Sequence, residues 1–357
     1  MEKVKIKNIF DFQKKSKIKA GDGFKLGEAQ YPFYTSSNEL TKSINEYLFE
    51  DESLIFGTGG LASIHFCNEK FAVSTDCFVI QPKDKKRVFS KFVYYYLSGN
   101  MNILENGFKG AGLKHISKDY LENIEIPLPN LATQQRIAAI LDQADAIILN
   151  NRAIVKKYDA LTQSLFLDMF GDPVKNEKGW EKKEFSKVAK NENSKRVPVK
   201  QSDRDEREGE YPYYGATGII DTIDDYKFDG EYLLIAEDGK NLLFRKKNNA
   251  FMAYGKFWVN NHAHILSCNN ICNLKYLEFF LNSIDLSPFI SGIDQIKLNK
   301  ASLDRIPVIV PPIELQNQFA ERVSVIEAQK QQAQLELAKS EELFQSLLQK
   351  AFKGELN

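Results

Sequence analysis

The stretch TQQRIAAILDQADAIILNNRAIVKKYDALTQSLFLDMF at residues 133–170 decides the fold of this chain, together with LQNQFAERVSVIEAQKQQAQLELAKSEELFQSLLQKAF at residues 315–352. In both stretches, mostly apolar side chains recur at alternating spacings of four and three residues. This alternation is the pattern of a coiled-coil seam, although an isolated copy would favour an ordinary core helix. Copies in the same register instead favour a pair of long helices that pack together.

The seams correspond position by position, with a constant offset of 182 residues. The first seam consists of Ile137, Leu141, Ala144, Ile148, Asn151, Val155, Tyr158, Thr162, Leu165 and Met169. The second seam consists of Phe319, Val323, Ile326, Lys330, Ala333, Leu337, Ser340, Phe344, Leu347 and Ala351. This correspondence predicts an internal repeat, in which each copy ends in one of the long helices.

Both helices have clear limits in the sequence. Each begins just after prolines, and the first ends at Phe170-Gly171-Asp172-Pro173, where a glycine cap precedes a helix breaker. The second ends at Phe352-Lys353-Gly354. At 1.5 Å per residue, each helix would be about 55 to 60 Å long, which a single globular domain does not need.

The segments before the helices repeat as well. Tyr31-Pro32-Phe33-Tyr34 returns as Tyr211-Pro212-Tyr213-Tyr214, about 180 residues later. Leu121-Glu122-Asn123-Ile124 returns as Leu303-Asp304-Arg305-Ile306. Further equivalents are Leu54-Ile55 with Leu234-Ile235, and Pro129 with Pro311.

Short runs of β-branched and aromatic residues indicate strands in both of these segments, for example at 53–56, 71–80 and 232–236. Each segment also has a helix-like run before its final turn, at 90–98 and at 274–283. We therefore expect a mixed α/β domain in each copy.

The predicted fold class is α+β, with an internal pseudo-twofold repeat. Its domains are mixed α/β units at residues 1–129 and 173–312, separated by long antiparallel coiled-coil helices at 130–172 and 313–357. A chain of 357 residues agrees with more than one hydrophobic core. Folding the second helix back along the first would return the C-terminus to the neighbourhood of the first domain.

Bulk composition gives little indication of a partner. Lysine plus arginine and aspartate plus glutamate each number 48, so a nucleic-acid signal must lie in how the charges are distributed. The N-terminus, MEKVKIKNIF, lacks the apolar core of a signal peptide, and we expect a cytoplasmic protein without membrane association. The four cysteines should accordingly be free thiols.

Sequence signatures of catalysis are largely missing. No P-loop occurs, and Gly57-Thr58-Gly59-Gly60 follows a strand-like run without a third glycine that opens a helix. No Asn-Pro-Pro-aromatic tetrapeptide of the kind used by amino-methyltransferases is present either. We expect no cofactor, and we interpret the glycine-rich stretch as a plain turn.

A zinc site is the alternative to a chain without a cofactor. Two histidines, His262 and His264, with two cysteines, Cys268 and Cys272, could complete a tetrahedron. The histidines alternate in a strand-like run and would face one side, whereas Cys268 and Cys272 lie in a segment that resembles a loop entering a helix. The first repeat has Cys77 near the matching strand but no histidine pair. We therefore interpret these residues as strand histidines and apolar-facing thiols, without a metal.

Polar and aromatic loops at matching places in the repeats indicate nucleic-acid binding. Amides and lysines can recognise base edges, and lysines and backbone N–H groups bind phosphates. Any one such loop is more often simply solvated, so the matched positions carry the argument. The candidate DNA-binding residues are Tyr34, Ser36, Thr58, Lys109, Lys114, Tyr214, Thr217, Lys240, Asn241, Lys256, Asn260 and Lys297.

The helices resemble those of the specificity subunits of type I restriction-modification systems. The residues from Leu161 to Pro173 resemble the end of that family's central conserved helix, and those from Leu347 to Leu356 resemble its C-terminal conserved helix. The resemblance covers essentially the whole chain. Further segments that fit are Ile124–Pro129, Gln134–Ile137, Tyr211–Gly218, Ile306–Pro312 and Gln316–Phe319.

The resemblance implies a non-catalytic, sequence-specific subunit for double-stranded DNA. Such a subunit recognises a two-part target with a fixed gap, binds two modification (methyltransferase) subunits and, through them, restriction subunits. It directs their methylation and restriction, a role in phage defence. The alternatives are a coiled-coil scaffold for protein interactions and a single-chain DNA enzyme.

Overall fold

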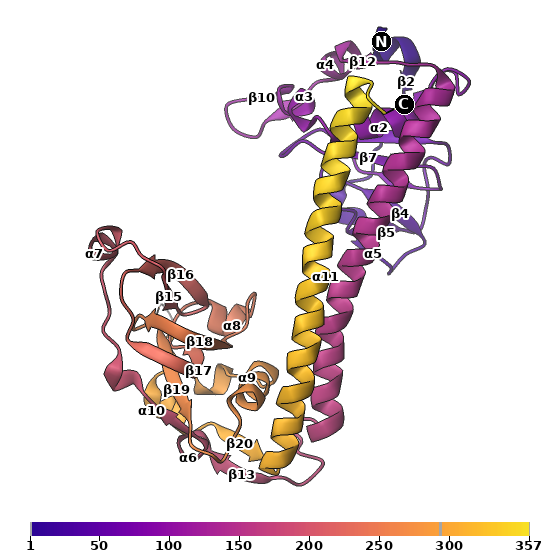
Figure 1. Ribbon diagram of the computed structural model, residues 1–357. Helices are drawn as coiled ribbons and strands as arrows, with labels where there is room; N and C mark the ends of the chain where they lie inside the picture. Colours follow the sequence, from indigo (N-terminus) through magenta and orange to yellow (C-terminus); the bar gives the residue numbers. More distant parts are fainter. Residues whose placement is uncertain (1, 293–294, 357) are drawn as a thin grey trace. The chain divides into compact units, whose positions relative to one another are not determined.

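A computed structural model describes residues 2–292 and 295–356 (Figure 1). The chain divides into two compact units. Unit 1 comprises Met1–Ala153 with Gln334–Asn357, and unit 2 comprises Ile154–Ala333. The long helices α5 (Leu131–Phe170) and α11 (Ile313–Lys353) each contribute one part to each unit.

Unit 1 carries the first β-rich domain beside its parts of the long helices. In chain order, its other elements are β1 (Lys3–Lys5), α1 (Ile6–Ile9), β2 (Phe10–Phe12), β3 (Phe24–Lys25), β4 (Tyr31–Tyr34), β5 (Lys42–Ile44), β6 (Ser53–Gly57), β7 (Ile64–Cys67), β8 (Ala72–Val73), β9 (Cys77–Pro82), α2 (Ser90–Ser98), α3 (Met101–Glu105), β10 (Phe108–Lys109), β11 (His115–Ile116), α4 (Lys118–Asn123) and β12 (Glu125–Pro127).

Unit 2 carries the second β-rich domain. Its other elements are β13 (Glu181–Glu184), α6 (Phe185–Val188), β14 (Ala189–Asn191), α7 (Gln201–Asp205), β15 (Tyr211–Gly215), β16 (Gly218–Ile223), β17 (Phe228–Ala236), α8 (Asn241–Phe244), β18 (Ala250–Val259), β19 (Ala263–Cys268), α9 (Leu274–Ser283), α10 (Lys300–Asp304) and β20 (Pro307–Val310). Short 3₁₀ turns lie at Ala20–Asp22 in unit 1, and at Asn193–Lys195 and Ser287–Phe289 in unit 2.

The domains share one topology, which confirms the predicted internal repeat. The equivalence of Leu54-Ile55 with Leu234-Ile235 is wrong by one residue, because the strand registers match Leu54-Ile55 with Leu233-Leu234. In unit 1, β1 pairs antiparallel with β12, and a sheet runs in the order β2-β9-β6-β7. In unit 2, β13 pairs antiparallel with β20, and the matching order is β14-β19-β17-β18. The repeated Tyr-Pro-aromatic-Tyr motifs form β4 and β15, which pair in parallel with β8 and β18 respectively.

The central strand of each sheet is buried on both faces, which explains its unbroken apolar sequence. On β6, Leu54 and Phe56 belong to one hydrophobic core and Ile55 to another. On β17, Leu233 and Ile235 belong to one core and Leu234 to another. Successive side chains therefore alternate between packed layers, as a strand requires.

The helix-like runs are confirmed as α2 and α9 with the expected bounds. The strand-like run at 71–80 forms two strands, because the chain turns at Ser74–Asp76 and changes sheets. β8 pairs with β4, whereas β9 pairs with β6. The Ser74 hydroxyl accepts a hydrogen bond from the Asp76 backbone N–H at 3.2 Å and so stabilises this turn.

The long helices are confirmed. Gly171, with φ +77°, follows α5, and its N–H donates to the Leu167 carbonyl at 2.8 Å. Gly354, with φ +80°, follows α11 in the same conformation. Glycine adopts this left-handed backbone without the steric cost of a side chain, which is why both helices end there.

The helices pack antiparallel in each unit (Figure 1). In unit 1, the Asn151 amide donates to the Ser340 hydroxyl at 3.1 Å, and Arg152 pairs with Glu341 at 2.7 Å. In unit 2, Lys330 pairs with Asp159 at 2.5 Å. The predicted seam residues are buried or half-buried along both helices, and the coiled-coil prediction is confirmed.

Each domain is attached to the helices through an apolar core and a buried glutamine. Gln134 accepts a hydrogen bond from the Phe89 N–H and donates to the Arg87 and Pro129 carbonyls, at 2.8–3.0 Å. Its repeat equivalent, Gln316, accepts from the Asn273 N–H at 2.9 Å. Gln316 also donates to the carbonyls of Pro311 at 2.8 Å and Ile271 at 3.5 Å.

The C-terminal end of α11 lies in the core of unit 1, as predicted. Leu348 and Ala351 are buried there, and the Phe352 ring lies 5.5 Å from that of Phe92 on α2. In unit 2, Phe166 and Phe170 at the end of α5 pack around Phe319. None of the helices within residues 2–292 and 295–356 combines the length and the hydropathy of a membrane-spanning segment.

Candidate nucleic-acid interface

In unit 1, several of the predicted loops meet at one edge of the domain. The loop after β6 pairs with the β10–β11 hairpin: the Ile116 N–H donates to the Thr58 carbonyl at 3.1 Å, and the Gly60 N–H donates to the Lys114 carbonyl at 3.3 Å. Lys109 lies opposite His115 in the same hairpin. The hairpin side chains Lys109 and Lys114 are both exposed.

Ser36 joins this cluster through a shared acceptor. Its hydroxyl donates to the Asp76 carbonyl at 2.8 Å, and the Thr58 backbone N–H donates to the same oxygen at 2.8 Å. Gly57 is required at this approach, because a Cβ there would lie 2.9 Å from the Cα of Ser36. We name loops 34–38, 57–60 and 109–115 the loop edge of unit 1.

Unit 2 has an equivalent edge. The Leu298 N–H donates to the Glu237 carbonyl at 2.8 Å, and the Gly239 N–H donates to the Ile296 carbonyl at 3.1 Å. Asp238 and Lys297 therefore lie opposite each other as a β-bridge. The adjacent side chains of Lys240 and Lys297 are exposed.

The turn before β19 completes this second edge. The Asn260 N–H donates to the Tyr214 carbonyl at 3.0 Å, and the Glu237 N–H donates to the His262 carbonyl at 2.8 Å. Loops 214–218, 237–241, 260–262 and 295–298 form the loop edge of unit 2. Thr217 lies half-buried in the turn between β15 and β16.

The tyrosines of the site prediction contribute mainly to packing. Tyr34 is buried, and its ring lies 5.8 Å from that of Phe71. The pKa of Tyr34 is raised, mainly by burial and secondly by the neighbouring Cys67. Tyr214 is half-buried and stacks on Phe251 at 5.9 Å, and burial raises its pKa as well. Both tyrosines therefore stay neutral and support the loops from beneath.

Several predicted polar residues shape the loops through internal bonds. The Asn241 amide donates to the Lys247 carbonyl at 2.9 Å and to Asn249 Oδ1 at 2.7 Å. Asn260 is buried, and its Oδ1 accepts from the His262 backbone N–H at 2.8 Å. Thr58 is buried as well.

Lys256 lies on β18 rather than in a loop. Its ammonium lies 4.6 Å from the centroid of the Tyr226 ring, and the interaction with Tyr226 raises the pKa of the lysine. In the β17–β18 register, Lys256 is opposite Asp229. The structure therefore groups Lys256 with Tyr226 and Asp229.

The histidines and cysteines considered for zinc have other surroundings. His262 lies in the turn before β19 and is exposed, whereas His264 on the strand is buried, so the expectation that both face one side is wrong. His264 is hydrogen-bonded to the Leu298 carbonyl at 2.7 Å, and burial lowers its pKa. Cys272 is buried, but Cys268 is exposed, so only one of these thiols faces apolar surroundings. Within residues 2–292 and 295–356, no group of three or more histidine, cysteine or acidic residues is placed to hold a metal ion.

Sequence reasoning missed His115, His262 and Arg196 as parts of the loop edges. His115 Nδ1 lies 3.1 Å from the Thr58 carbonyl oxygen. Arg196 pairs with Glu237 at 2.7 Å and donates to the Ala263 carbonyl at 2.8 Å. His115 directly follows the predicted Lys114, and His262 lies two residues after the predicted Asn260, so adjacency in the chain could have found both. Arg196 reaches its loop edge only through tertiary contacts.

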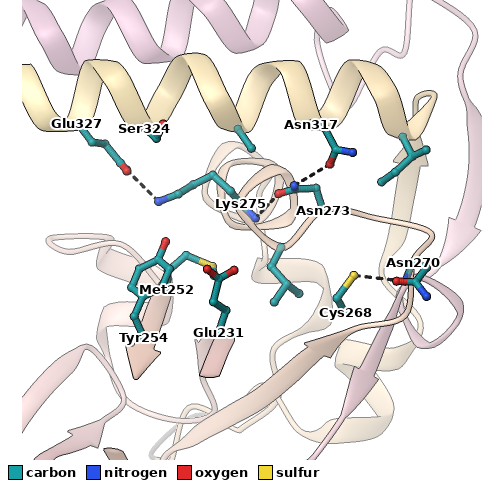
Figure 2. A pocket seen from close by; sticks show the side chains of 13 residues that line it. Glu231, Met252, Tyr254, Cys268, Asn270, Asn273, Lys275, Asn317, Ser324 and Glu327 are labelled. Carbon is teal, nitrogen blue, oxygen red and sulfur yellow. Dashed lines mark hydrogen bonds and ion pairs between the residues drawn. The ribbon is translucent and has the colours of Figure 1, made fainter. Parts of the chain in front are cut away.

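A separate hollow of about 450 Å³ in unit 2 lies where α9 approaches α11 (Figure 2). Lys275 extends across it to Glu327 at 3.0 Å, and the Asn273 amide donates to Asn317 Oδ1 at 3.0 Å. In unit 1, Lys91 on α2 pairs similarly with Asp142 on α5 at 2.8 Å. These pairs attach each domain to its helix, and we assign the hollow to that attachment.

The fold thus defines a duplicated protein in which matched loop edges lie on similar domains attached to long helices. The family model described as the type I restriction modification DNA specificity domain matches residues 1–157 and 177–338. The chain belongs to this family. That result confirms the resemblance seen in the helices.

Relatives agree over parts of the chain. The Haemophilus influenzae protein S.HindORF215P, named as a type I restriction enzyme specificity subunit, is 37% identical over 146 residues, which cover 41% of this chain and 37% of the relative. The Escherichia coli EcoDI specificity subunit is 31% identical over 127 residues, covering 35% and 28%. The chain therefore spans about two fifths or less of the length of these relatives.

Solved structures confirm the fold over the whole chain. The S subunit of a type I restriction-modification system from M. genitalium matches with a TM-score of 0.67 at 18% identity, covering 98% of this chain and 96% of that one. A chain from a structure on complex assembly and conformational transition of the type I system matches with a TM-score of 0.55 at 14% identity, covering 99% and 98%.

Proposed function

We propose that this chain is the specificity subunit of a type I restriction-modification system, which binds a two-part DNA target and directs methylation and restriction by partner subunits. One observation carries the proposal: the loop edges share a backbone frame but differ in side chains. A pair of such edges suits a pair of different half-sites. Domains at 1–129 and 173–312 would recognise the half-sites, and helices at 130–172 and 313–357 would connect them.

The exposed cations of the loop edges support DNA binding. Lys109 and Lys114 in unit 1, and Lys240 and Lys297 in unit 2, are exposed beside loops whose backbone is held rigid. Lysines in such positions bind phosphates, which fixes the orientation of the loops on the duplex. Polar side chains in the same loop edges, such as Ser36 and Thr217, would face the bases.

The partners would be two modification subunits, with restriction subunits joining through them. Exposed apolar side chains on the long helices suit protein partners, for example Leu335 and Leu343 on α11 and Leu149 on α5. The chain itself would carry no catalytic chemistry, since its sequence lacks a cofactor loop and the amino-methyltransferase tetrapeptide. Its place of action would be the cytoplasm, where the DNA substrate lies.

The test is reconstitution with the modification subunit of the same system. Methylation of a random DNA library should require both proteins and should mark one two-part sequence with a constant gap. The chain alone should bind DNA in a gel shift without turnover of S-adenosylmethionine. Turnover by the chain alone, or methylation without sequence preference in its presence, would contradict the proposal.

A further inference from the structure

A polar groove of about 350 Å³ lies in the loop edge of unit 2. Its position matches the Thr58 region of unit 1, where Gly59 pairs with His115. A groove of this size can hold the edge of a base. Its lining consists of Asp238, Gly239, Lys240, His262, Gln295, Ile296 and Lys297.

Asp238 has a fixed position in this groove. Backbone hydrogen bonds on either side of it, from Leu298 to Glu237 and from Gly239 to Ile296, hold its main chain. The His262 Nδ1 atom lies 2.7 Å from the Asp238 Oδ2 atom, so the ring N–H donates to the carboxylate. One oxygen of Asp238 is therefore occupied by a neighbouring side chain.

The other oxygen of Asp238, Oδ1, is not used by any of the residues that the structure describes. Within the described residues, no hydrogen bond is made to Oδ1, and the side chain is 26% exposed. His262 is oriented in turn by Asn260, whose Oδ1 accepts from the His262 backbone N–H. His262 and Asn260 therefore hold the Asp238 carboxylate in place in the lining of the groove.

A carboxylate at a DNA-binding edge is repelled by phosphates, so it is useful only opposite a hydrogen-bond donor. In the major groove, cytosine presents its N4 amino group as a donor, whereas guanine N7 and O6 and thymine O4 are acceptors. Adenine also presents an amino group, but its N7 acceptor lies beside it and would face the same carboxylate. Cytosine is therefore the base that the carboxylate accepts best.

Resting on the proposed function, we propose that Asp238, oriented by His262, recognises one cytosine in the half-site of the second domain. Its free oxygen accepts a hydrogen bond from the cytosine N4 amino group. The same carboxylate repels the acceptor atoms of guanine and thymine. Binding to these bases is therefore weakened, which increases the specificity for cytosine. Lys240 and Lys297 beside it offset the repulsion from phosphates.

The test is selection from a DNA library with randomised half-sites, using the full chain with its modification subunit. Wild type, Asp238→Asn and His262→Gln would be compared, with Glu231→Gln on β17 as a charge-removal control outside the groove. We expect cytosine at one position of one half-site in wild type. Asp238→Asn should reduce the preference there by about tenfold and leave other positions unchanged. His262→Gln should reduce the same preference less.

Binding to random-sequence DNA distinguishes recognition from general attraction. Because Asp238→Asn removes a negative charge, its affinity for random DNA should be unchanged or higher, and Glu231→Gln should leave the selected sequence intact. A wild-type profile in both groove variants, or a loss spread over all positions, would refute the role of Asp238. If Asp238→Asn fails to fold, the His262→Gln variant tests the proposal by itself, because His262 is exposed and its replacement should leave the fold intact. If wild type itself selects no sequence, the proposed function fails rather than this assignment only.

Discussion

The loop edges of unit 1 and unit 2 have the same backbone frame and different side chains. After β6, the loop is Gly57-Thr58-Gly59-Gly60, and its backbone pairs with the β10–β11 hairpin. At the end of β17, the equivalent segment is Ala236-Glu237-Asp238-Gly239, and its backbone pairs with residues 296–298. Since main-chain hydrogen bonds hold both loops, the side chains are free to differ without loss of the fold.

The glutamines that anchor the domains to the long helices are, by contrast, identical in the two units. Gln134 and Gln316 occupy equivalent places, are fully buried, and make the same kinds of hydrogen bond to backbone groups. A buried side chain with several backbone partners has few substitutes, because any replacement leaves those partners unsatisfied. The comparison separates positions that maintain the scaffold from positions that are free to specify a target.

The largest expected effect comes from changing the helices that both units share. Inserting one heptad at matched points in α5 and α11 preserves the seam and lengthens each helix by about 10 Å. If the helices set the half-site spacing, the selected gap should grow by about three base pairs. Binding should also weaken, because the duplex turns by roughly a quarter to a third of a turn over that distance.

Selection from a library with randomised gap lengths measures this change. Insertion into one helix alone serves as the control, and it should mismatch the seam and lower the melting temperature. If the folded double-insertion variant selects the wild-type gap, the spacing is set elsewhere, for example by the modification subunits.

Loss of the buried anchors should come next. Gln134→Met and Gln316→Met keep the approximate shape of the side chain but remove its hydrogen bonds, and each should reduce the free energy of unfolding by on the order of 3 kcal/mol. Urea denaturation would measure the loss. The exposed neighbours Gln135→Ala and Gln318→Ala should be close to neutral. Anchor variants as stable as these controls would show that the buried bonds contribute little.

Smaller, graded effects are expected at the loop lysines. Lys114→Ala in unit 1 and Lys297→Ala in unit 2 should each weaken binding to all sequences several-fold and reduce the salt dependence by about one charge. Lys157→Ala on α5, outside both loop edges, is the control. Titrations over a range of salt concentrations would test this. A lysine variant that altered only sequence preference would be reassigned to base recognition.

The smallest expected difference is a pH effect confined to unit 2. Burial raises the pKa of Glu192, but hydrogen bonds from Lys190, Lys195 and Ser267 outweigh it and lower the pKa to about 2. The equivalent position in unit 1 is the uncharged Gln13. A lowered folded-state pKa contributes stability that is present above the unfolded value near 4.5 and is lost as the pH falls toward about 2.

Replacement of the carboxylate tests this contribution. Glu192→Gln should lower the melting temperature at about pH 7, and its difference from wild type should shrink at about pH 3. A difference that stays constant over this range would assign Glu192 a role independent of its charge.

Sequence reasoning located most of the functional loops because the repeat marked them twice. The loops around Gly59 and Asp238, and those around His115 and Lys297, recur at matching places in the two domains. Lys256 had no counterpart in the first repeat. It lies on β18 rather than in a loop, and its ammonium is close to the ring of Tyr226. The sequence predicted the place of Tyr34 and Tyr214 beside the loops but not their burial, since an aromatic side chain beside a loop can point inward or outward.

The sequence by itself determined the repeat, the long helices and their ends, because heptad spacing and glycine caps are local signals with direct physical causes. Only the tertiary structure brought Arg196 to the loop edge of unit 2 and placed His115 beside Thr58. Their contacts join segments far apart in the chain, such as Arg196 to Glu237 and His115 to Thr58. No local pattern encodes such meetings, because they depend on how the sheets place the ends of their strands.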